Sequence, residues 1–211
     1  MINIYYSYLS EGNHESLLRN HLPDFPENYQ AKISRFRRWQ DAQASVLGRI
    51  LLFTGLKEAG FLGPADKELK YTSYHKPYFE DHPVQFNISH SGEIVVCALS
   101  DEGEIGIDIE IISDILIDDF KFQMTENEWE RISTSTNTKN AFFEYWTQKE
   151  AVIKAHGHGL TIPLQSFEIT DYSTIIQGEK FYLKEINIDK KYQCALSLKT
   201  TIKDVVLKHL S

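Results

Sequence analysis

The segment Ile105-Gly106-Ile107-Asp108-Ile109-Glu110 constrains the fold of this chain more than any other. Isoleucine alternates there with glycine and acidic residues, which is typical of a β-strand with one buried face. Because successive side chains point to opposite faces, Asp108 and Glu110 share a side, with Cα atoms about 6.5 Å apart. Two such carboxylates repel each other unless a cation or water lies on them. The segment therefore predicts a strand with a hydrophobic face and an acidic face, and the acidic face can hold a hard metal ion.

A second segment, Trp146 to Lys154, is expected to lie in a long helix that begins near Asn140 and ends at Gly157-His158-Gly159. Glu150 and Lys154 are four residues apart and therefore share a helix face. A Glu-Lys pair at this spacing is more often a surface ion pair than a catalytic device. The helix alone does not decide between these two interpretations.

Composition limits the class of protein. The chain has 211 residues, 42% of them hydrophobic and 25% charged, which is ordinary for a folded domain with a real core. Its net charge of −8 argues against non-specific binding of nucleic acid, which needs clustered Lys and Arg. Cys97 and Cys194 lie in apolar runs without metal-ligand spacing, so we expect reduced core thiols in a cytoplasmic protein. No segment has the length and hydrophobicity of a signal peptide or a membrane span.

The first half of the chain contains the positive charges and a polar turn. A strand is expected near residues 2–9, a basic helix from Tyr29 to Arg38 and a longer helix from Asp41 to Ala59. The basic helix is either a solvated surface or an anion site. After an aromatic loop from Asp66 to Pro83, a hairpin is expected over residues 85–99 around Ser89-His90-Ser91-Gly92. This turn is either an ordinary polar turn or a cradle for phosphate.

The second half contains further helix and strand signals and two short sequence matches to the first half. Thr125 and Glu128 fit a capping box, and strands are expected near Ser166–Thr170, Phe181–Ile188, Tyr192–Leu198 and Val205–Leu207. The sequence Cys97-Ala98-Leu99-Ser100 recurs as Cys194-Ala195-Leu196-Ser197, and Phe36 to Trp39 resembles Phe143 to Trp146. Short matches arise easily by chance, but they are also what a duplicated architecture would leave.

Three motifs occur together in a fixed order. They are Phe86-Asn87-Ile88-Ser89-His90-Ser91-Gly92, Ile105 to Glu110, and Trp146-x-x-Lys149-Glu150-Ala151-x-x-Lys154 followed by Gly157-x-Gly159-Leu160. The combination resembles the 4'-phosphopantetheinyl transferases, in particular the two-lobed surfactin-synthetase-activating type rather than the short trimeric holo-acyl-carrier-protein synthases. The resemblance extends from about Lys32 through Leu164.

The resemblance implies an α/β (α+β) fold of two similar subdomains related by a pseudo-twofold, each a small, mostly antiparallel sheet packed on a long helix. Residues 1–104 would form one lobe and residues 105–211 the other, with the active site in the cleft between them. The implied reaction is the Mg²⁺-dependent transfer of the phosphopantetheine arm of coenzyme A to a serine of an apo acyl or peptidyl carrier protein. Adenosine 3',5'-bisphosphate is released, and the enzyme is expected to be a monomer.

The resemblance also implies roles for individual residues. Asp108, Glu110 and Glu150 would hold the metal, and Lys154 would stabilise the leaving group. Glu150 would accept the serine proton either directly or through a metal-bound water, and the sequence does not separate these routes. The expected contacts to coenzyme A are Lys32, Arg37, Arg38, Lys76, Ser89 and His90.

Two departures from the family pattern affect these expectations. His75 stands before Lys76-Pro77 where the family commonly has glycine, which raises a question about the backbone at the phosphate site. Ile111-Ile112-Ser113-Asp114 follows the acidic strand where a basic residue is frequent. We therefore expect the carrier protein to be recognised through an apolar groove rather than through charge. The residues expected to contribute to this groove are Ile111, Ile112, Ile115, Leu116 and Phe120.

Two other classes of function compete with this interpretation. A metal-dependent phosphoesterase or nuclease could use the same acids, but the net charge is wrong for nucleic acid and the third ligand is a glutamate rather than a His cluster. A non-catalytic carrier-binding protein would be expected to have lost one of the three acids, and all three are present.

Overall fold

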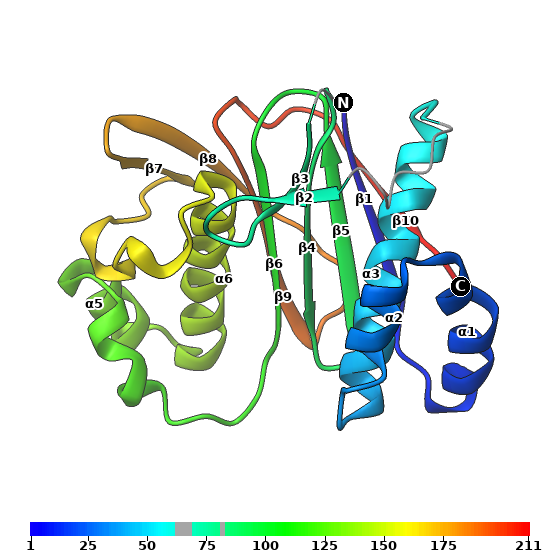
Figure 1. The fold of residues 1–211 in the computed structure, drawn as a ribbon. Coiled ribbons are helices and arrows are strands. Elements are labelled where there is room, and N and C mark those ends of the chain that lie inside the picture. Colours follow the sequence, from blue (N-terminus) through cyan, green and yellow to red (C-terminus); the bar gives the residue numbers. More distant parts are fainter. Residues whose placement is uncertain (62–68, 81–82) are drawn as a thin grey trace.

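Each lobe of the chain is built around one four-stranded sheet with one long helix packed on it (Figure 1). The structure is a computed structural model, and it describes residues 1–61, 69–80 and 83–211. Its elements up to the middle of the chain are β1 (Ile2–Tyr8), η1 (Glu11–Asn13), α1 (His14–His21), η2 (Leu22–Asp24), α2 (Glu27–Ile33), α3 (Trp39–Glu58), β2 (Leu69–Tyr71), β3 (Pro77–Phe79), β4 (Gln85–Ser91) and β5 (Ile94–Ser100). The remaining elements are β6 (Ile105–Ile111), η3 (Ile117–Gln123), α5 (Glu126–Thr134), α6 (Thr138–His156), η4 (Gly159–Thr161), η5 (Leu164–Ser166), β7 (Ser173–Ile176), β8 (Glu179–Glu185), β9 (Tyr192–Leu198) and β10 (Val205–His209).

The first lobe packs α3 against a sheet with the strand order β10-β1-β5-β4. α3 carries glycine where it approaches the sheet most closely. A methyl group at Gly55 would lie 2.7 Å from the side chain of Leu99 and 2.8 Å from Tyr5. Glycine inside a helix costs about 1 kcal/mol, but Gly55 allows α3 to pack closely on β1 and β5.

The second lobe packs α6 against a sheet with the strand order β6-β9-β8-β7. Here the close approach is made by the strand. A methyl group at Gly106 would overlap the carbonyl oxygen of Ala151 and the amide nitrogen of Ala155. Gly106 thus lets the backbone of α6 pack directly on β6.

The two lobes repeat one topology, which confirms the predicted fold class. In the first lobe the order strand, helix, hairpin gives β1-β5-β4, and in the second the same order gives β6-β9-β8, with antiparallel neighbours throughout. The repeated Cys-Ala-Leu-Ser sequences lie on β5 and β9, which are the equivalent inner strands. The other sequence match, between Phe36–Trp39 and Phe143–Trp146, does not lie at equivalent positions. Trp39 begins α3, whereas Trp146 lies within α6.

A shared core joins the two sheets. Ile105, Ile107 and Ile109 of β6 are fully buried and pack in one cluster with Ile2 and Ile4 of β1. β10 also crosses between the lobes, because it pairs in parallel with β1 although it follows the second lobe in the chain. The boundary at residue 104 remains a prediction, and the last strand lies in the sheet of the first lobe.

Several predicted elements differ from the observed ones. The basic helix ends at Ile33, and Arg37 and Arg38 lie in the connection to α3. The expected loop from Asp66 to Pro83 contains the hairpin β2–β3, while its residues 66–68 and 81–82 lie outside the described residues. Residues 166–170 form no strand, because η5 and a single bridge at Thr170 take their place.

The capping box is confirmed. The Thr125 hydroxyl accepts a hydrogen bond from the Glu128 amide, and the Glu128 carboxylate accepts one from the Thr125 amide. Gly157 ends α6 with a φ of 88°, as its position predicts. Among the residues that the structure describes, none of the helices combines the length and hydrophobicity that crossing a membrane requires.

Candidate active site

β6 presents its acidic face to α6. Asp108 and Glu110 lie on the same side of the strand as Gly106, on which α6 packs. Asp108 is 3% exposed, whereas Glu110 at the end of the strand is half-buried. The alternation in the sequence correctly predicts the acidic face of the strand, and the structure adds that α6 packs on this face.

α6 brings a cation to the first of these carboxylates. The Nζ of Lys154 lies 2.6 Å from Asp108 Oδ1 and 2.8 Å from Ser89 Oγ. Glu150 lies one turn earlier on the same helix face. Residues from β4, β6 and α6 thus meet where the two lobes touch.

The acids of this site affect one another electrostatically. Burial raises the pKa of Glu150, with the charge of Asp108 adding to the effect and Lys154 opposing it. Burial also raises the pKa of Glu110, and the charges of Asp108 and Glu150 raise it further, against the Ser91 hydrogen bond and Lys154. Lys154 opposes these shifts, but one ammonium does not offset three carboxylates, so the site favours an additional cation.

Polar side chains of β4 join it to β6. Ile107 N donates to Asn87 Oδ1 at 2.9 Å, Ile109 N donates to Ser89 Oγ at 3.4 Å, and Ile111 N donates to Ser91 Oγ at 3.1 Å. Each pair is 20 residues apart in sequence, so the two strands run in the same direction. The edges of the two sheets are therefore connected through side chains, and the acids of β6 lie along this junction.

Lys76 reaches the same junction from the β2–β3 hairpin. Its Nζ lies 2.5 Å from Glu104 Oε2 and 3.3 Å from the carbonyl oxygen of Ala155 in the last turn of α6. The side chain is 11% exposed, and its Cδ would lie 3.4 Å from a methyl group placed on Gly157. An ammonium carries three donor hydrogens, so one remains for a ligand.

The residue before Lys76 adopts an unusual backbone conformation. His75 has a φ of 63°, which is the left-handed region that glycine enters without strain. Hydrogen bonds to Thr72 hold the turn, from His75 N to its carbonyl at 2.9 Å and from Lys76 N to its hydroxyl at 3.1 Å. The histidine therefore keeps the conformation expected of glycine, at a cost of about 1–2 kcal/mol.

The remaining predicted contacts to coenzyme A are more dispersed. His90 lies on the α3 side of β4, opposite to Ser89, and part of its side chain remains in contact with solvent. Partial desolvation of the imidazole and the charge of Lys154 lower its pKa, against Asp41 and Asp108. Lys32, Arg37 and Arg38 are exposed on or after α2, and their side chains form no hydrogen bond or ion pair with the part of the chain that is described. The structure therefore brings together Ser89, Asp108 and Lys154, places Lys76 beside Glu104 and the last turn of α6, and leaves the basic cluster at the surface.

Comparison with known proteins decides the family. Residues 104–206 match the profile described as the 4'-phosphopantetheinyl transferase superfamily, and residues 15–102 match the profile described as 4'-phosphopantetheinyl transferase, N-terminal. The "4'-phosphopantetheinyl transferase" of Bacillus subtilis is 34% identical over 175 residues, which cover 78% of each chain. The "4'-phosphopantetheinyl transferase Sfp" of Bacillus subtilis strain 168 is 31% identical over the same length and the same shares. A third relative, "4'-phosphopantetheinyl transferase gsp" of Aneurinibacillus migulanus, is 39% identical over 150 residues, 70% of this chain and 62% of the relative.

The chain belongs to the 4'-phosphopantetheinyl transferase superfamily. It is a transferase of the two-lobed type, because both halves match and the matches divide at the junction between β5 and β6. Its activity is the transfer of phosphopantetheine to carrier proteins.

Three features of the transferase site were not predicted from the sequence. Ser91 Oγ donates to Glu110 Oε2 at 2.7 Å, and Glu104 binds Lys76. The sequence does contain a pattern that indicates a role for Ser91, because the polar residues Asn87, Ser89 and Ser91 alternate along β4 and therefore share one face of the strand. No local pattern connects Glu104 with Lys76, since they lie in different segments.

The third unpredicted feature is a buried ion pair behind the site. Lys149 and Glu128 are fully buried, and Lys149 Nζ lies 2.8 Å from Glu128 Oε2. The same ammonium donates to the carbonyl oxygens of Leu164 at 2.8 Å and Phe167 at 2.7 Å. This network fixes α6 of the transferase to α5 and to the segment after η4.

Proposed function

We propose that the transferase moves the 4'-phosphopantetheine arm of coenzyme A to a serine hydroxyl of an apo acyl or peptidyl carrier protein, with Mg²⁺ held by Asp108, Glu110 and Glu150. The observation that supports this most is the meeting of Lys154, Asp108 and Ser89 beside two further carboxylates. We also propose a cytoplasmic location, which the two buried free thiols favour.

The donor set fits a hard cation. Asp108 Oδ2 is buried and has no hydrogen-bond partner among the described residues, so one carboxylate oxygen is free to bind a metal ion. Glu110 and Glu150 add oxygen ligands whose pKa values are raised by burial and by like charge. Within residues 1–61, 69–80 and 83–211, however, no three His, Cys, Asp or Glu side chains are already arranged to hold a metal ion. The ligand assignment is therefore supported by chemistry and remains a proposal.

The chain's own residues account for the charges of the reaction. Attack of a serine oxygen on the β-phosphorus places negative charge on the leaving and non-bridging oxygens, and bound Mg²⁺ would supply part of the stabilisation. Lys154 lies against Asp108 and would stabilise the leaving phosphate. Glu150 would accept the serine proton, either directly or through water. For coenzyme A we propose Lys76 and His90 at the phosphates, with Lys32, Arg37 and Arg38 at the nucleotide end.

Ser89 is less available for coenzyme A than the sequence suggests. A hydroxyl has one donor and two acceptor positions. Ser89 Oγ donates to Asp108 Oδ1 at 2.9 Å and accepts from Lys154 Nζ and from Ile109 N. A coenzyme A phosphate accepts hydrogen bonds, so it can bind this hydroxyl only after the bond from Ser89 Oγ to Asp108 opens.

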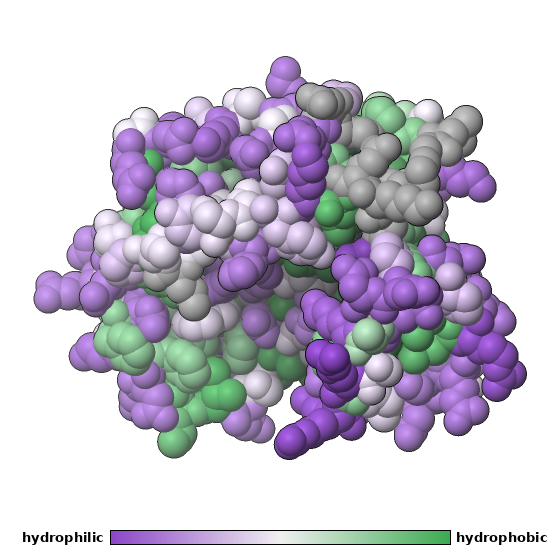
Figure 2. Space-filling view, viewed as in Figure 1, coloured by the Kyte–Doolittle hydropathy of each residue, from purple (hydrophilic) through white to green (hydrophobic). Residues whose placement is uncertain are grey.

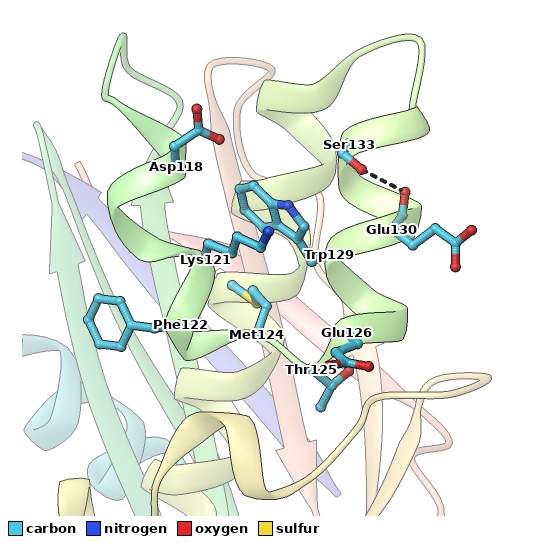
Figure 3. Close-up of a pocket in the computed structure, with 9 residues that line it drawn as sticks. All are labelled: Asp118, Lys121, Phe122, Met124, Thr125, Glu126, Trp129, Glu130 and Ser133. Atoms are coloured by element: carbon cyan, nitrogen blue, oxygen red, sulfur yellow. Dashed lines mark hydrogen bonds between the residues drawn. The ribbon is translucent and has the colours of Figure 1, made fainter.

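The carrier protein would bind an apolar surface near η3 and α5. Leu116 is 76% exposed and Phe122 is 63% exposed, and hydrophobic residues gather over these elements at the lower left of Figure 2. Next to them a pocket of about 720 Å³ contains Trp129, toward which Lys121 reaches (Figure 3). Of the five residues predicted for the groove, Ile115 and Leu116 are exposed, whereas Phe120 packs on Phe142 and Trp146. We therefore propose an apolar docking surface of Ile115, Leu116 and Phe122, next to a pocket that charged side chains also line.

The test is to incubate the transferase with coenzyme A, Mg²⁺ and a panel of apo carrier proteins and to measure the mass of each carrier. A gain of one phosphopantetheine on at least one carrier is expected, and no gain on any carrier would contradict the proposal. For a carrier that gains phosphopantetheine in this assay, the association rate of its apo form with the transferase should change little with ionic strength, because the proposed docking surface is apolar. A steep fall with salt would instead indicate recognition by charge.

A further inference from the structure

The junction between β4 and β6 repeats one contact. Ser89 Oγ donates to Asp108 Oδ1 at 2.9 Å and accepts from the amide of the next residue, Ile109. Two residues later, Ser91 Oγ donates to Glu110 Oε2 at 2.7 Å and accepts from the amide of Ile111. Ser89 and Ser91 on β4 thus each bind one acid of β6 together with the backbone amide that follows it.

The repeat ends where α6 crosses β6. Asn87 binds the amide of Ile107 at 2.9 Å, but the preceding residue is Gly106, which has no side chain to receive a second bond. The serines are therefore found only opposite acids. Their hydrogen bonds to the backbone fix the position of each hydroxyl, because a main-chain amide of a paired strand moves little.

A carboxylate held through one oxygen presents the other oxygen in a defined direction. For Asp108 the bound oxygen is Oδ1, and Oδ2 is buried without a hydrogen-bond partner among the described residues. For Glu110 the bound oxygen is Oε2. Hydrogen-bond partners of this kind orient metal-binding carboxylates and affect metal affinity although they do not touch the metal.

We infer that Ser91 is a positioning residue that orients the Glu110 carboxylate for Mg²⁺, and that Ser89 orients Asp108 in the same way from the same strand. The inference rests on the proposed function, since it takes Asp108 and Glu110 as metal ligands. It also implies that the packing of the first lobe against β6 sets the geometry of a metal site whose ligands all belong to the second lobe.

Ser91 is the better residue to test, because Ser89 also touches Lys154. The experiment measures the Kd of Mn²⁺, used in place of Mg²⁺, from the electron paramagnetic resonance signal of free Mn²⁺ without coenzyme A or carrier protein. Ser91→Ala should weaken Mn²⁺ binding about 10- to 100-fold. Ser91→Thr keeps the hydroxyl and should remain within about threefold of the unchanged protein, and Ser91→Cys, with its weak donor, should fall between them.

The matched control is Ser197→Ala. Ser197 lies on β9 opposite Gly106, is fully buried and has no hydrogen-bond partner in the described part of the chain, so its replacement should leave the Mn²⁺ Kd unchanged. Thermal unfolding of every variant shows whether it is folded. If Ser91→Ala does not fold, the Mn²⁺ Kd of Ser91→Cys is used in its place. A Kd within twofold of the unchanged protein for Ser91→Ala, or for Ser91→Cys in its place, overturns the inference and leaves the proposed function standing. If the unchanged protein binds no Mn²⁺, the metal assignment and the inference both fail.

Discussion

The Nζ of Lys154 lies 2.6 Å from Oδ1 of Asp108, so α6 already pairs a cation with the most deeply buried acid of the site. Because Asp108 also carries a free buried oxygen, its carboxylate serves both Lys154 and the proposed metal. Asp108→Asn keeps the size of the side chain and removes its charge. We expect a loss of transfer rate of about 10²–10³-fold, the usual effect of removing one charge-stabilising group.

Carrier modification measured by mass spectrometry checks this prediction. Asp101→Asn is the control, because Asp101 is an exposed acid paired with the amino terminus and lies outside the site. Both variants should give circular dichroism spectra of a folded protein. Full activity of Asp108→Asn would remove Asp108 from the proposed metal site.

Gly106 is expected to be the glycine least tolerant of substitution. A methyl group there would lie 3.0 Å from Ala155 Cα and would overlap backbone atoms of α6, which cannot move aside as a flexible side chain can. Gly106→Ala should therefore lower the free energy of unfolding by about 3 kcal/mol or more, or prevent folding. Gly12→Ala is the control, because its nearest atom would be Ser10 Oγ at 3.9 Å. Urea unfolding of both variants provides the comparison, and equal midpoints would contradict the prediction.

The buried pair of Lys149 and Glu128 should contribute strongly to stability when only one partner is removed. Burial lowers the pKa of Lys149, and the charge of Glu128 opposes the shift. Lys149→Met leaves the Glu128 carboxylate buried without its cation and should cost about 3–5 kcal/mol. The double variant with Glu128→Gln should recover part of this loss, because no charge is then buried.

Urea unfolding of the single and double variants forms a double-mutant cycle. Lys139→Met is the matched control, since Lys139 pairs with the exposed Asp114 and its loss should cost less than about 1 kcal/mol. A double variant as unstable as the sum of the two single variants would show that the pair has no coupling.

Glu104 is expected to compete with coenzyme A for Lys76. Their side chains lie 2.5 Å apart, and the carboxylate neutralises the ammonium that we assign to a substrate phosphate. Lys76→Ala should raise the KM for coenzyme A about tenfold, because a charged hydrogen bond is lost. Glu104→Gln should lower this KM roughly two- to fivefold, since it releases an ion pair of modest strength.

Steady-state kinetics with varied coenzyme A checks both variants. Lys70→Ala is the control, because Lys70 lies on the same hairpin and pairs with the exposed Glu80. A higher KM in Glu104→Gln would mean that Glu104 positions Lys76 rather than competing for it.

His90 should make the stability of the protein sensitive to mild acid. Desolvation lowers its pKa, with Lys154 adding to the shift and Asp41 and Asp108 opposing it. As the pH falls below 6.5, the unfolded chain binds a proton before the folded protein does, so the free energy of unfolding decreases until the pH has passed the folded pKa. His90→Gln lacks this titration. Urea midpoints between pH 7.5 and 5 should therefore fall less in His90→Gln than in the unchanged protein, and parallel curves would contradict the prediction.

Local periodicity explains which features could be predicted from the sequence. Asp108 and Glu110 are two residues apart on a strand, and Glu150 and Lys154 are four apart on a helix, so their shared faces follow from backbone geometry. The capping box of Thr125 and Glu128 is local in the same sense. The family resemblance added the duplicated fold, which the strand orders of the two lobes confirm.

The sequence by itself therefore determined the strand, the helix and the acids that they carry. Only the tertiary structure decided what those acids touch. Ser91 meets Glu110, Glu104 meets Lys76, and Lys149 meets Glu128 because separate segments pack side by side, and no short pattern records that packing. β10 likewise joins β1 across the whole length of the chain. The physical reason is that spacing along a strand or helix fixes a direction within one element, whereas contacts between elements depend on how those elements pack to bury their apolar surfaces.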